Sequence, residues 1–328
     1  MQDLQRAGAP AVSAAWIMMY HRICEPGPDT ACYHERGTAV TPARFATQIE
    51  WLAERCEMVA LRELWRRVTE PGRSAGRPLC ALTFDDGYRD VLERAAPICR
   101  RYAAPMCIYP VTDPVNESRP IWVDRYYDLI HRARRRSGLR ARELVFSMVQ
   151  DDEVPGLDDD LRWWVRGPIK EHLHELGPEQ REHALRRLAG ILDAEWRGSL
   201  VDALYMSRDE LLVLAGVRAG ASRDTANEFG GHGGSHSRLT GLSDSDLQRE
   251  LERSHELLDA LGVREDRSFC YPDGHHDLRV RTAVARAGFS FACTVERGLV
   301  IESTEPMTLP RCLVRDTSPE QWSHFRGF

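Results

Sequence analysis

Short apolar runs alternate with helical patterns over the first hundred residues. Three runs of strand length lie at residues 11–20, 79–84 and 105–111. Between the first two, Thr41 followed by Pro42 makes a good N-cap and first turn for a helix with apolar positions at helical spacing. A second helix is expected around residues 88–102. Alternation of strands with helices predicts a parallel sheet covered by helices.

The middle of the chain, residues 112–225, differs in its residue pattern from the first part, and this pattern predicts only helices. It is rich in arginine, and no strand-period alternation stands out in it. Helical patterns separated by Gly and Pro lie at residues 122–136, 161–176 and 179–196. We interpret the segment as a helical insertion or lid. A surface that binds a substrate carrier and an oligomer interface are the alternative roles that the pattern leaves open.

The strand and helix alternation resumes after residue 225. Ser243 caps a helix whose leucines at positions 247, 251, 258 and 261 share one face. Strands are expected at 267–272, 289–295 and 307–314, with a helix at 277–287. The chain is therefore divided into a first barrel part, the helical insertion and a second barrel part, at residues 11–111, 112–225 and 226–328.

Composition and charge argue against a nucleic-acid-binding or membrane-spanning protein. A chain of 328 residues with 42% hydrophobic and 29% charged residues is long enough for one large α/β barrel or two ordinary domains. The formal charge of −6 provides no general basic field, so a nucleic-acid partner is not expected. The run at 11–20 is about half the ~20 residues that span a bilayer, so we expect no transmembrane segment. Nine cysteines without a CxxC pair predict free buried thiols in a reducing cytoplasm.

Two adjacent carboxylates end the second apolar run. Asp85 and Asp86 follow the apolar strand in the sequence LTFDDG, residues 82–87. In a parallel α/β barrel the carboxyl end of a strand faces the mouth where chemistry is done. One carboxylate can bind a metal ion while the other takes a proton from water. A turn with helix-capping acids is the alternative interpretation, since Asp and Gly are common in turns.

A pair of histidines lies in a glycine-rich segment. His232 and His236 are four residues apart in GGHGGSH, residues 230–236. A helix or a compact loop can bring both imidazoles to one metal ion, and two histidines with one carboxylate are the protein ligands of many catalytic sites. A flexible loop with two exposed histidines is the alternative.

The order of the motifs resembles the polysaccharide deacetylases that share the NodB homology domain. TFDDG is followed by HxxxH, by YPDG at 271–274, by AGF at 287–289 and by LPR at 309–311. The flanking sequences YMSRDELLVLA at 205–215 and SRLTGLS at 237–243 are also similar, and the likeness covers about residues 16–111 and 205–315. MMYHRI at 18–23 resembles the N-terminal motif of the circularly permuted members. The resemblance implies an α/β fold, a distorted (β/α) barrel of the NodB type, here with a helical insertion.

The resemblance also implies roles for individual residues. Asp86, His232 and His236 would hold one divalent ion, commonly zinc, with nickel, cobalt or iron as substitutes. Asp85 would be the general base for the attacking water. The backbone N–H of Tyr271, in the YP motif, would donate to the tetrahedral oxyanion.

The proton donor for the leaving amine is expected at the start of the chain. A C-terminal leucine–histidine motif, which many members use, is missing here, and His21 in MMYHRI stands in the corresponding place of the permuted members. His21 is therefore the candidate general acid. A buried histidine at a strand end is the alternative interpretation.

Several positions depart from the family pattern. Gly233 stands where a Ser or Thr usually follows the first histidine, and Cys270 stands in the region where an arginine usually orients the base. Arg311 of LPR is the candidate replacement for that arginine, because a guanidinium can hold a carboxylate through two hydrogen bonds. It can equally be structural. His275 and His276 are new polar residues after YPDG, either at the substrate's edge or on the surface.

The resemblance, together with these residues, implies a metal-dependent carbohydrate N-deacetylase. Its substrate would be an N-acylated, most simply N-acetylated, sugar or oligosaccharide of a bacterial glycan or glycan precursor. A deformylase would use the same mechanism. A catalytically silent metal-binding or glycan-binding module is the alternative from another class.

Overall fold

A computed structural model describes residues 15–70, 76–134, 161–192, 199–217 and 227–322. The strands of its main sheet pair in parallel in the order β10, β1, β5, β6 and β7, and β4 also pairs in parallel with β5. These strands are β1 (Ala15–Tyr20), β4 (Glu57–Met58), β5 (Leu79–Asp86), β6 (Met106–Pro110), β7 (Glu228–Phe229) and β10 (Cys312–Leu313).

Isolated bridges close this sheet into a distorted barrel. Strands β8 (Ser268–Cys270) and β9 (Phe291–Cys293) pair with each other in parallel. Gly231, just beyond β7, bridges to Phe269 of β8, and Cys293 of β9 bridges to Leu309 shortly before β10. The strands therefore form a closed ring in the order β10, β1, β5, β6, β7, β8 and β9, and β9 bridges to the segment just before β10. The expected α/β barrel is confirmed, with shorter strands in its second part than the apolar runs suggest.

Alternation along the strands separates an inner core from an outer one. The inner cluster contains Ile17 of β1, Ala81 of β5 and Tyr109 of β6. The preceding residue in each of these strands belongs to the outer cluster, which packs against the covering helices. Successive strand residues point to opposite faces. Position 85 therefore continues the inward row of Ala81 and Thr83, and the side chain of Asp85 enters the barrel near its mouth.

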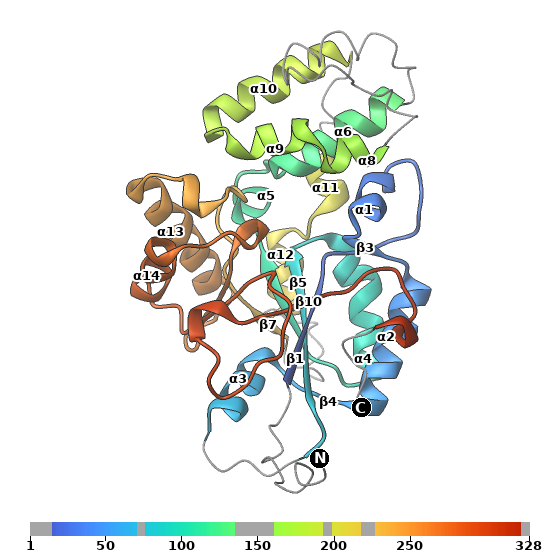
Figure 1. Cartoon of the computed structure of the whole chain (residues 1–328), viewed down its shortest axis with the longest axis vertical. Helices are drawn as coiled ribbons and strands as arrows, with labels where there is room; N and C mark the ends of the chain where they lie inside the picture. The colour runs from blue at the N-terminus through green and yellow to red at the C-terminus, as the bar shows by residue number, and fades with distance from the viewer. Residues whose placement is uncertain (1–14, 71–75, 135–160, 193–198, 218–226, 323–328) are drawn as a thin grey trace, which may run out of the picture.

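Helices α2 (Pro42–Arg55) and α4 (Ala96–Arg101) cover the outer face of the sheet, whereas α3 (Leu61–Thr69) lies on the other side of β1 and β5 and packs against the inner cluster (Figure 1). The short α1 (Ala31–Arg36) follows β2 (Arg22–Ile23), which forms a two-stranded sheet with β3 (Ala39–Val40). Thr41 caps α2 by accepting from the N–H of Arg44, as its sequence predicts.

The helix predicted at 88–102 is only partly regular. Residues Val91–Ala95 form a π-helical turn ahead of α4, in which the N–H of Ala96 donates to Val91, five residues back. Pro97 follows at once and has no N–H to give to the preceding turn. The change of hydrogen-bond register therefore has a local cause.

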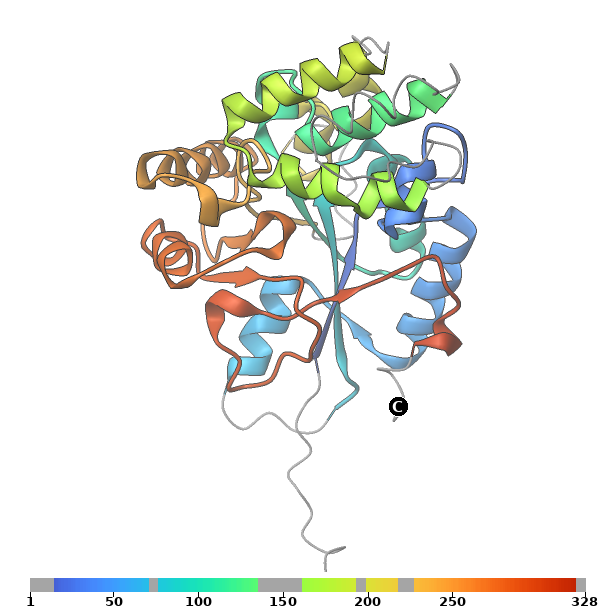
Figure 2. The same ribbon diagram turned by 45° about the horizontal axis from the view of Figure 1, so that its top comes forward.

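The described part of residues 112–217 contains helices joined by short irregular stretches, and its one β-bridge lies between Tyr205 and Tyr88. Its helices are α5 (Thr112–Asn116), α6 (Trp122–Arg134), α8 (Leu161–Arg166), α9 (Pro168–Glu175), α10 (Pro178–Ile191), α11 (Leu200–Leu204) and α12 (Arg208–Leu214). Figure 2 shows α6, α9 and α10 above the end of the barrel to which β1 and β5 point. The predicted helix positions 135–136 and 193–196, like strand positions 11–14, lie outside the described residues.

The second part returns to the barrel through α13 (Asp244–Ala260) and α14 (Leu278–Arg286). Ser243 caps α13 by accepting from the N–H of Asp246, and the leucines at 247, 251 and 258 of this helix are buried. Across the described ranges, no helix is both long and apolar enough to cross a bilayer.

Candidate active site

Asp85 is held inside the barrel by a buried arginine. Arg311 donates from Nη1 to Asp85 Oδ1 at 2.7 Å and from Nη2 to Oδ2 at 2.8 Å, and its side chain is fully buried. Its Nε donates to the carbonyl of Thr294 at 2.8 Å, and this further hydrogen bond fixes the orientation of the guanidinium. Burial alone would raise the pKa of Asp85, but the charge and hydrogen bonds of Arg311 outweigh it and the pKa is lowered. Asp85 is therefore an ionised carboxylate in a fixed orientation.

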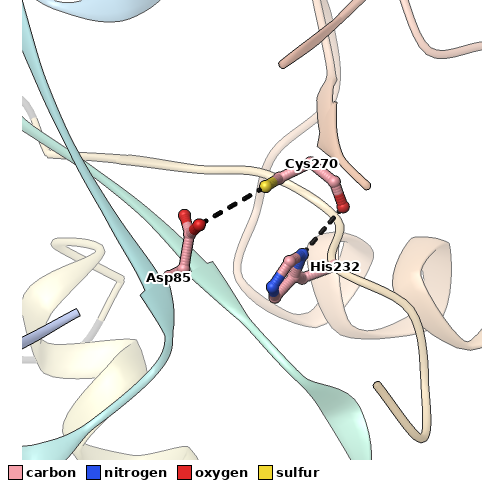
Figure 3. A group of neighbouring side chains, drawn as sticks. All are labelled: Asp85, His232 and Cys270. Carbon is pink, nitrogen blue, oxygen red and sulfur yellow. Dashed lines mark hydrogen bonds between the residues drawn. The ribbon is translucent and has the colours of Figure 1, made fainter. Parts of the chain in front are cut away.

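Cys270 occupies the space beside this pair. Its Sγ lies 3.6 Å from Asp85 Oδ2 and accepts from Arg311 Nη2 at 3.0 Å. Figure 3 shows Cys270 between Asp85 and His232, with its carbonyl oxygen turned to the imidazole. The structure thus places Arg311 in contact with the carboxylate, with the smaller thiol of Cys270 beside the pair.

Asp86, His232 and His236 converge on one point. Oδ1 of Asp86 lies 3.4 Å from Nε2 of His232 and 3.3 Å from Nε2 of His236. One ligand atom from each residue lies within 4.8 Å of the others, a spacing at which a single ion can be bound. Asp86 ends β5 with a φ of 71°, a left-handed conformation that Asp tolerates better than most residues.

The surroundings of these three side chains favour a positive charge between them. Oδ1 of Asp86 is buried and accepts no hydrogen bond within the described ranges. His232 Nδ1 lies 2.7 Å from the carbonyl of Cys270, and donation to that oxygen leaves the Nε2 lone pair directed at Asp86. Burial would raise the pKa of Asp86, but His236 and His232 lower it. Two imidazoles and one carboxylate facing each other suit zinc or a similar divalent ion.

Glycines allow the histidine segment to pack closely on the barrel. A side-chain carbon on Gly230 would lie 2.2 Å from the ring of Tyr109, so this position excludes any larger residue. Gly233 has a φ of +75°, and a carbon on it would lie 2.8 Å from Glu250. The departure from Ser or Thr at 233 therefore has a physical reason, since the backbone there is left-handed and the space is filled.

Glu250 and Ser254 of α13 order this segment in place of the missing hydroxyl. Oε2 of Glu250 accepts from the N–H groups of Gly234 at 2.5 Å and Ser235 at 3.0 Å. The hydroxyl of Ser254 accepts from the N–H of Gly233 at 3.0 Å. We did not predict these contacts from the sequence. A glutamate among buried leucines on one helix face was the available signal.

His21 lies beside Asp85 at the end of β1. Its Nε2 is 3.9 Å from Asp85 Oδ2, and its buried Nδ1 has no hydrogen-bond partner in the described structure. Burial lowers the pKa of His21 even though both aspartates raise it. The position is compatible with proton transfer at the cavity.

Tyr271 also borders the cavity, but its N–H is engaged. It donates to the carbonyl of Cys293 at 3.3 Å, while the phenol donates to Met307 at 3.0 Å. His276 packs its ring against Tyr271 and lies 3.7 Å from Glu296, and His275 is exposed. Neither histidine is among the residues that line the cavity.

A cavity of about 320 Å³ joins these residues to the helical segment. Its barrel side includes His21, Asp85, Asp86, His232, His236 and Tyr271. Helices α1, α6, α8 and α9 supply much of the remaining wall. The site is therefore a pocket at the mouth of an α/β barrel, with an ionised carboxylate beside a candidate centre for one divalent ion.

One family model matches part of the chain. A family model described as polysaccharide deacetylase matches residues 217–292, which include the histidine pair and YPDG. No curated protein matches the sequence. The model match and the fold together confirm the resemblance to the polysaccharide deacetylases of the NodB type.

Solved deacetylases share the fold over nearly the whole chain. The Streptococcus pyogenes deacetylase PplD, solved with acetate, is 17% identical with a TM-score of 0.57, covering 94% of this chain and 96% of that one. IcaB from Ammonifex degensii is 14% identical with a TM-score of 0.55 and 94% coverage of each chain. A de-N-acetylase from Aggregatibacter actinomycetemcomitans is 11% identical with a TM-score of 0.53, covering 93% and 96%. At such identities the likeness shows the fold.

The Arg311–Asp85 pair predicts a specific pattern of stability. We expect Arg311→Met to lower the free energy of unfolding by about 3–5 kcal/mol, because it leaves a buried carboxylate unpaired. Adding Asp85→Asn should recover part of this loss, since the charge is then gone. Chemical denaturation measures all three variants. Arg315→Met, an exposed arginine nearby, is the control and should change stability by no more than about 0.5 kcal/mol. Strictly additive losses in the double variant would contradict the pairing.

Proposed function

We propose that this chain is a metal-dependent hydrolase that removes an N-acetyl group from a sugar of a bacterial glycan or glycan precursor. The observation that carries the proposal is the convergence of Asp86, His232 and His236 beside an ionised Asp85. A divalent ion held by the three ligands would polarise the amide carbonyl and make bound water more acidic. Zinc is the ion that best suits this donor set.

Asp85 is the proposed general base. Its carboxylate accepts a proton from the water whose oxygen bonds to the amide carbon, and the carbonyl becomes a tetrahedral oxyanion. Arg311 is a positioning residue, because its two hydrogen bonds fix the carboxylate and its burial prevents the guanidinium from reaching the substrate. Tyr271 remains the proposed oxyanion donor, and its N–H would then give up the 3.3 Å bond to Cys293.

His21 is the proposed general acid. When the carbon–nitrogen bond breaks, the nitrogen takes a proton from the imidazolium and leaves as an amine, and acetate is the second product. The 3.9 Å between His21 Nε2 and Asp85 Oδ2 lets the carboxylate stabilise the charged imidazole before transfer. A formyl group would undergo the same steps. Assays of acetate and formate release therefore determine which acyl group the protein removes.

The alternative function, a catalytically silent binding module, would need a metal centre but no general base. The buried Asp85–Arg311 pair beside the ligands favours the enzyme, because a module that only binds gains nothing from an ionised carboxylate at the cavity. Metal content and acetate release measured on one preparation distinguish the two functions. An ion without any hydrolysis of acetylated sugars would favour the module.

Asp85→Asn should keep the metal ion and lose most turnover. The amide cannot accept the water proton, and loss of a general base typically costs about 10²- to 10⁴-fold in rate. Elemental analysis and acetate release should be compared with His232→Ala, which we expect to lose the ion, and with His275→Ala, which removes an exposed histidine and should keep it. If Asp85→Asn instead loses the ion and is active when metal is restored, the roles of the two aspartates are reversed.

His21→Ala should slow an amide substrate strongly and an activated ester much less. The ester's leaving group departs without a proton, so it does not need the acid. Metal content and melting temperature serve as controls, because loss of a ligand or of packing would change one of them. Equal losses on both substrates, with the ion and fold intact, would refute the acid role.

A further inference from the structure

Four basic side chains line the cavity and form what we call its basic side. Arg36 ends α1, Arg166 ends α8, Lys170 lies in α9, and Arg315 follows β10. They come from three regions of the chain that are distant in sequence, and each lines the same cavity as the catalytic residues proposed above. Lys170 is the deepest, with 4% of its surface exposed, and Arg315 lies at the exposed rim.

The carboxylates that line this cavity already have other partners. Asp85 is paired with Arg311, and Asp86 faces the two histidines. Asp124 accepts hydrogen bonds from the hydroxyls of Tyr33, Tyr88 and Tyr205. Asp273 pairs with Arg238 at 2.7 Å. None of the four is therefore dedicated to neutralising the basic side.

The basic groups themselves have weak or no carboxylate partners. Lys170 Nζ donates to the Tyr127 hydroxyl at 3.3 Å, and no carboxylate of the described chain lies within 4 Å of it. Arg166 is 4.0 Å from Glu35 and Arg36 is 3.9 Å from Asp273, both at the outer limit for an ion pair. Burying an ammonium group without a counter-charge is costly. Such a site is stabilised when an anion enters.

The pKa of Lys170 agrees with this geometry. Burial, followed by the charge of Arg36, lowers the pKa of Lys170 to about 8. An anion bound beside the amine would favour its charged form. The chain as a whole carries a net charge of −6, so the concentration of positive charge at this wall is a local feature.

We propose that Arg36, Arg166, Lys170 and Arg315 bind an anionic group, phosphate or carboxylate, on the N-acetylated sugar. The identity of the sugar part rests on the proposed deacetylase function. At about 320 Å³ the cavity is at the lower end of ligand pockets, which suits one sugar with a charged substituent better than a stretch of polymer. Arginine and lysine donors around one pocket are the usual means of recognising phosphate and carboxylate.

Binding of three sugars tests the proposal without turnover. Isothermal calorimetry with the Asp85→Asn protein would compare N-acetylglucosamine, its 1-phosphate and N-acetylmuramic acid, which carries a carboxylate. We expect at least one anionic sugar to bind about tenfold tighter than the neutral one. The tighter of the two anionic sugars identifies the charged group as phosphate or carboxylate.

Variants in the same background locate the effect. Lys170→Met and Arg315→Met should each weaken the anionic sugar about tenfold and leave the neutral sugar within about twofold. Arg66→Met is the matched control, since it removes the same charge from an exposed site on α3 and should change neither affinity. Methionine suits the buried position of Lys170, and the exposed Arg315 supplies a second variant if that protein does not fold.

Acetate release by the metal-loaded wild type separates this proposal from the deacetylase function. Equal affinities for neutral and anionic sugars, or equal losses for both in Lys170→Met, would overturn the anion site even if acetate is released. Absence of binding to all three sugars would overturn it as well. Tight, Lys170-dependent binding without acetate release from any sugar would support the anion site and contradict the deacetylase function.

Discussion

The buried pair between Arg311 and Asp85 is the contact on which the arrangement of the site depends. The two residues are 226 positions apart, and the pair joins the end of β5 to the segment that enters β10. Either charge alone would be strongly destabilising inside the barrel, so the two segments are stable there only together. The same pair fixes the orientation of Asp85 and keeps it ionised, and Asp86 then follows at the mouth of the barrel.

A second constraint is the tight fit of the glycine-rich segment. Gly230 allows it to lie against Tyr109, and Glu250 and Ser254 of α13 accept its backbone N–H groups beyond His232. These contacts fix the position of the irregular segment that carries the two histidines. The metal-binding geometry therefore depends on a helix whose residues never touch the proposed ion.

The sequence was most informative where chemistry and local structure coincide. Asp85 and Asp86 at a strand end, and the spacing of His232 and His236, predicted the residues that meet in the cavity, and Thr41 and Ser243 predicted the starts of two helices. These signals are local, because they depend on neighbouring residue types. The structure also brings Arg311 to Asp85, as expected if it replaces the arginine that the third motif lacks.

Long-range contacts could not be predicted in the same way. The bridges that close the barrel, the role of Glu250 and the basic side of the cavity each join residues whose approach is set by the whole fold. Lys170 is an example, since in the sequence it is one charge in a helical pattern. Only the packing of α9 over the barrel shows that it is buried at the cavity.

Anomalous diffraction from a crystal containing zinc can locate the metal ion without depending on activity. We expect one peak, about 2.0–2.2 Å from a carboxylate oxygen of Asp86 and from Nε2 of both His232 and His236. Asp85, His232 and Cys270 form a second group of possible ligands within the same 4.8 Å limit. A peak among those three residues, or none at the mouth of the barrel, would rule out a metal centre formed by Asp86, His232 and His236.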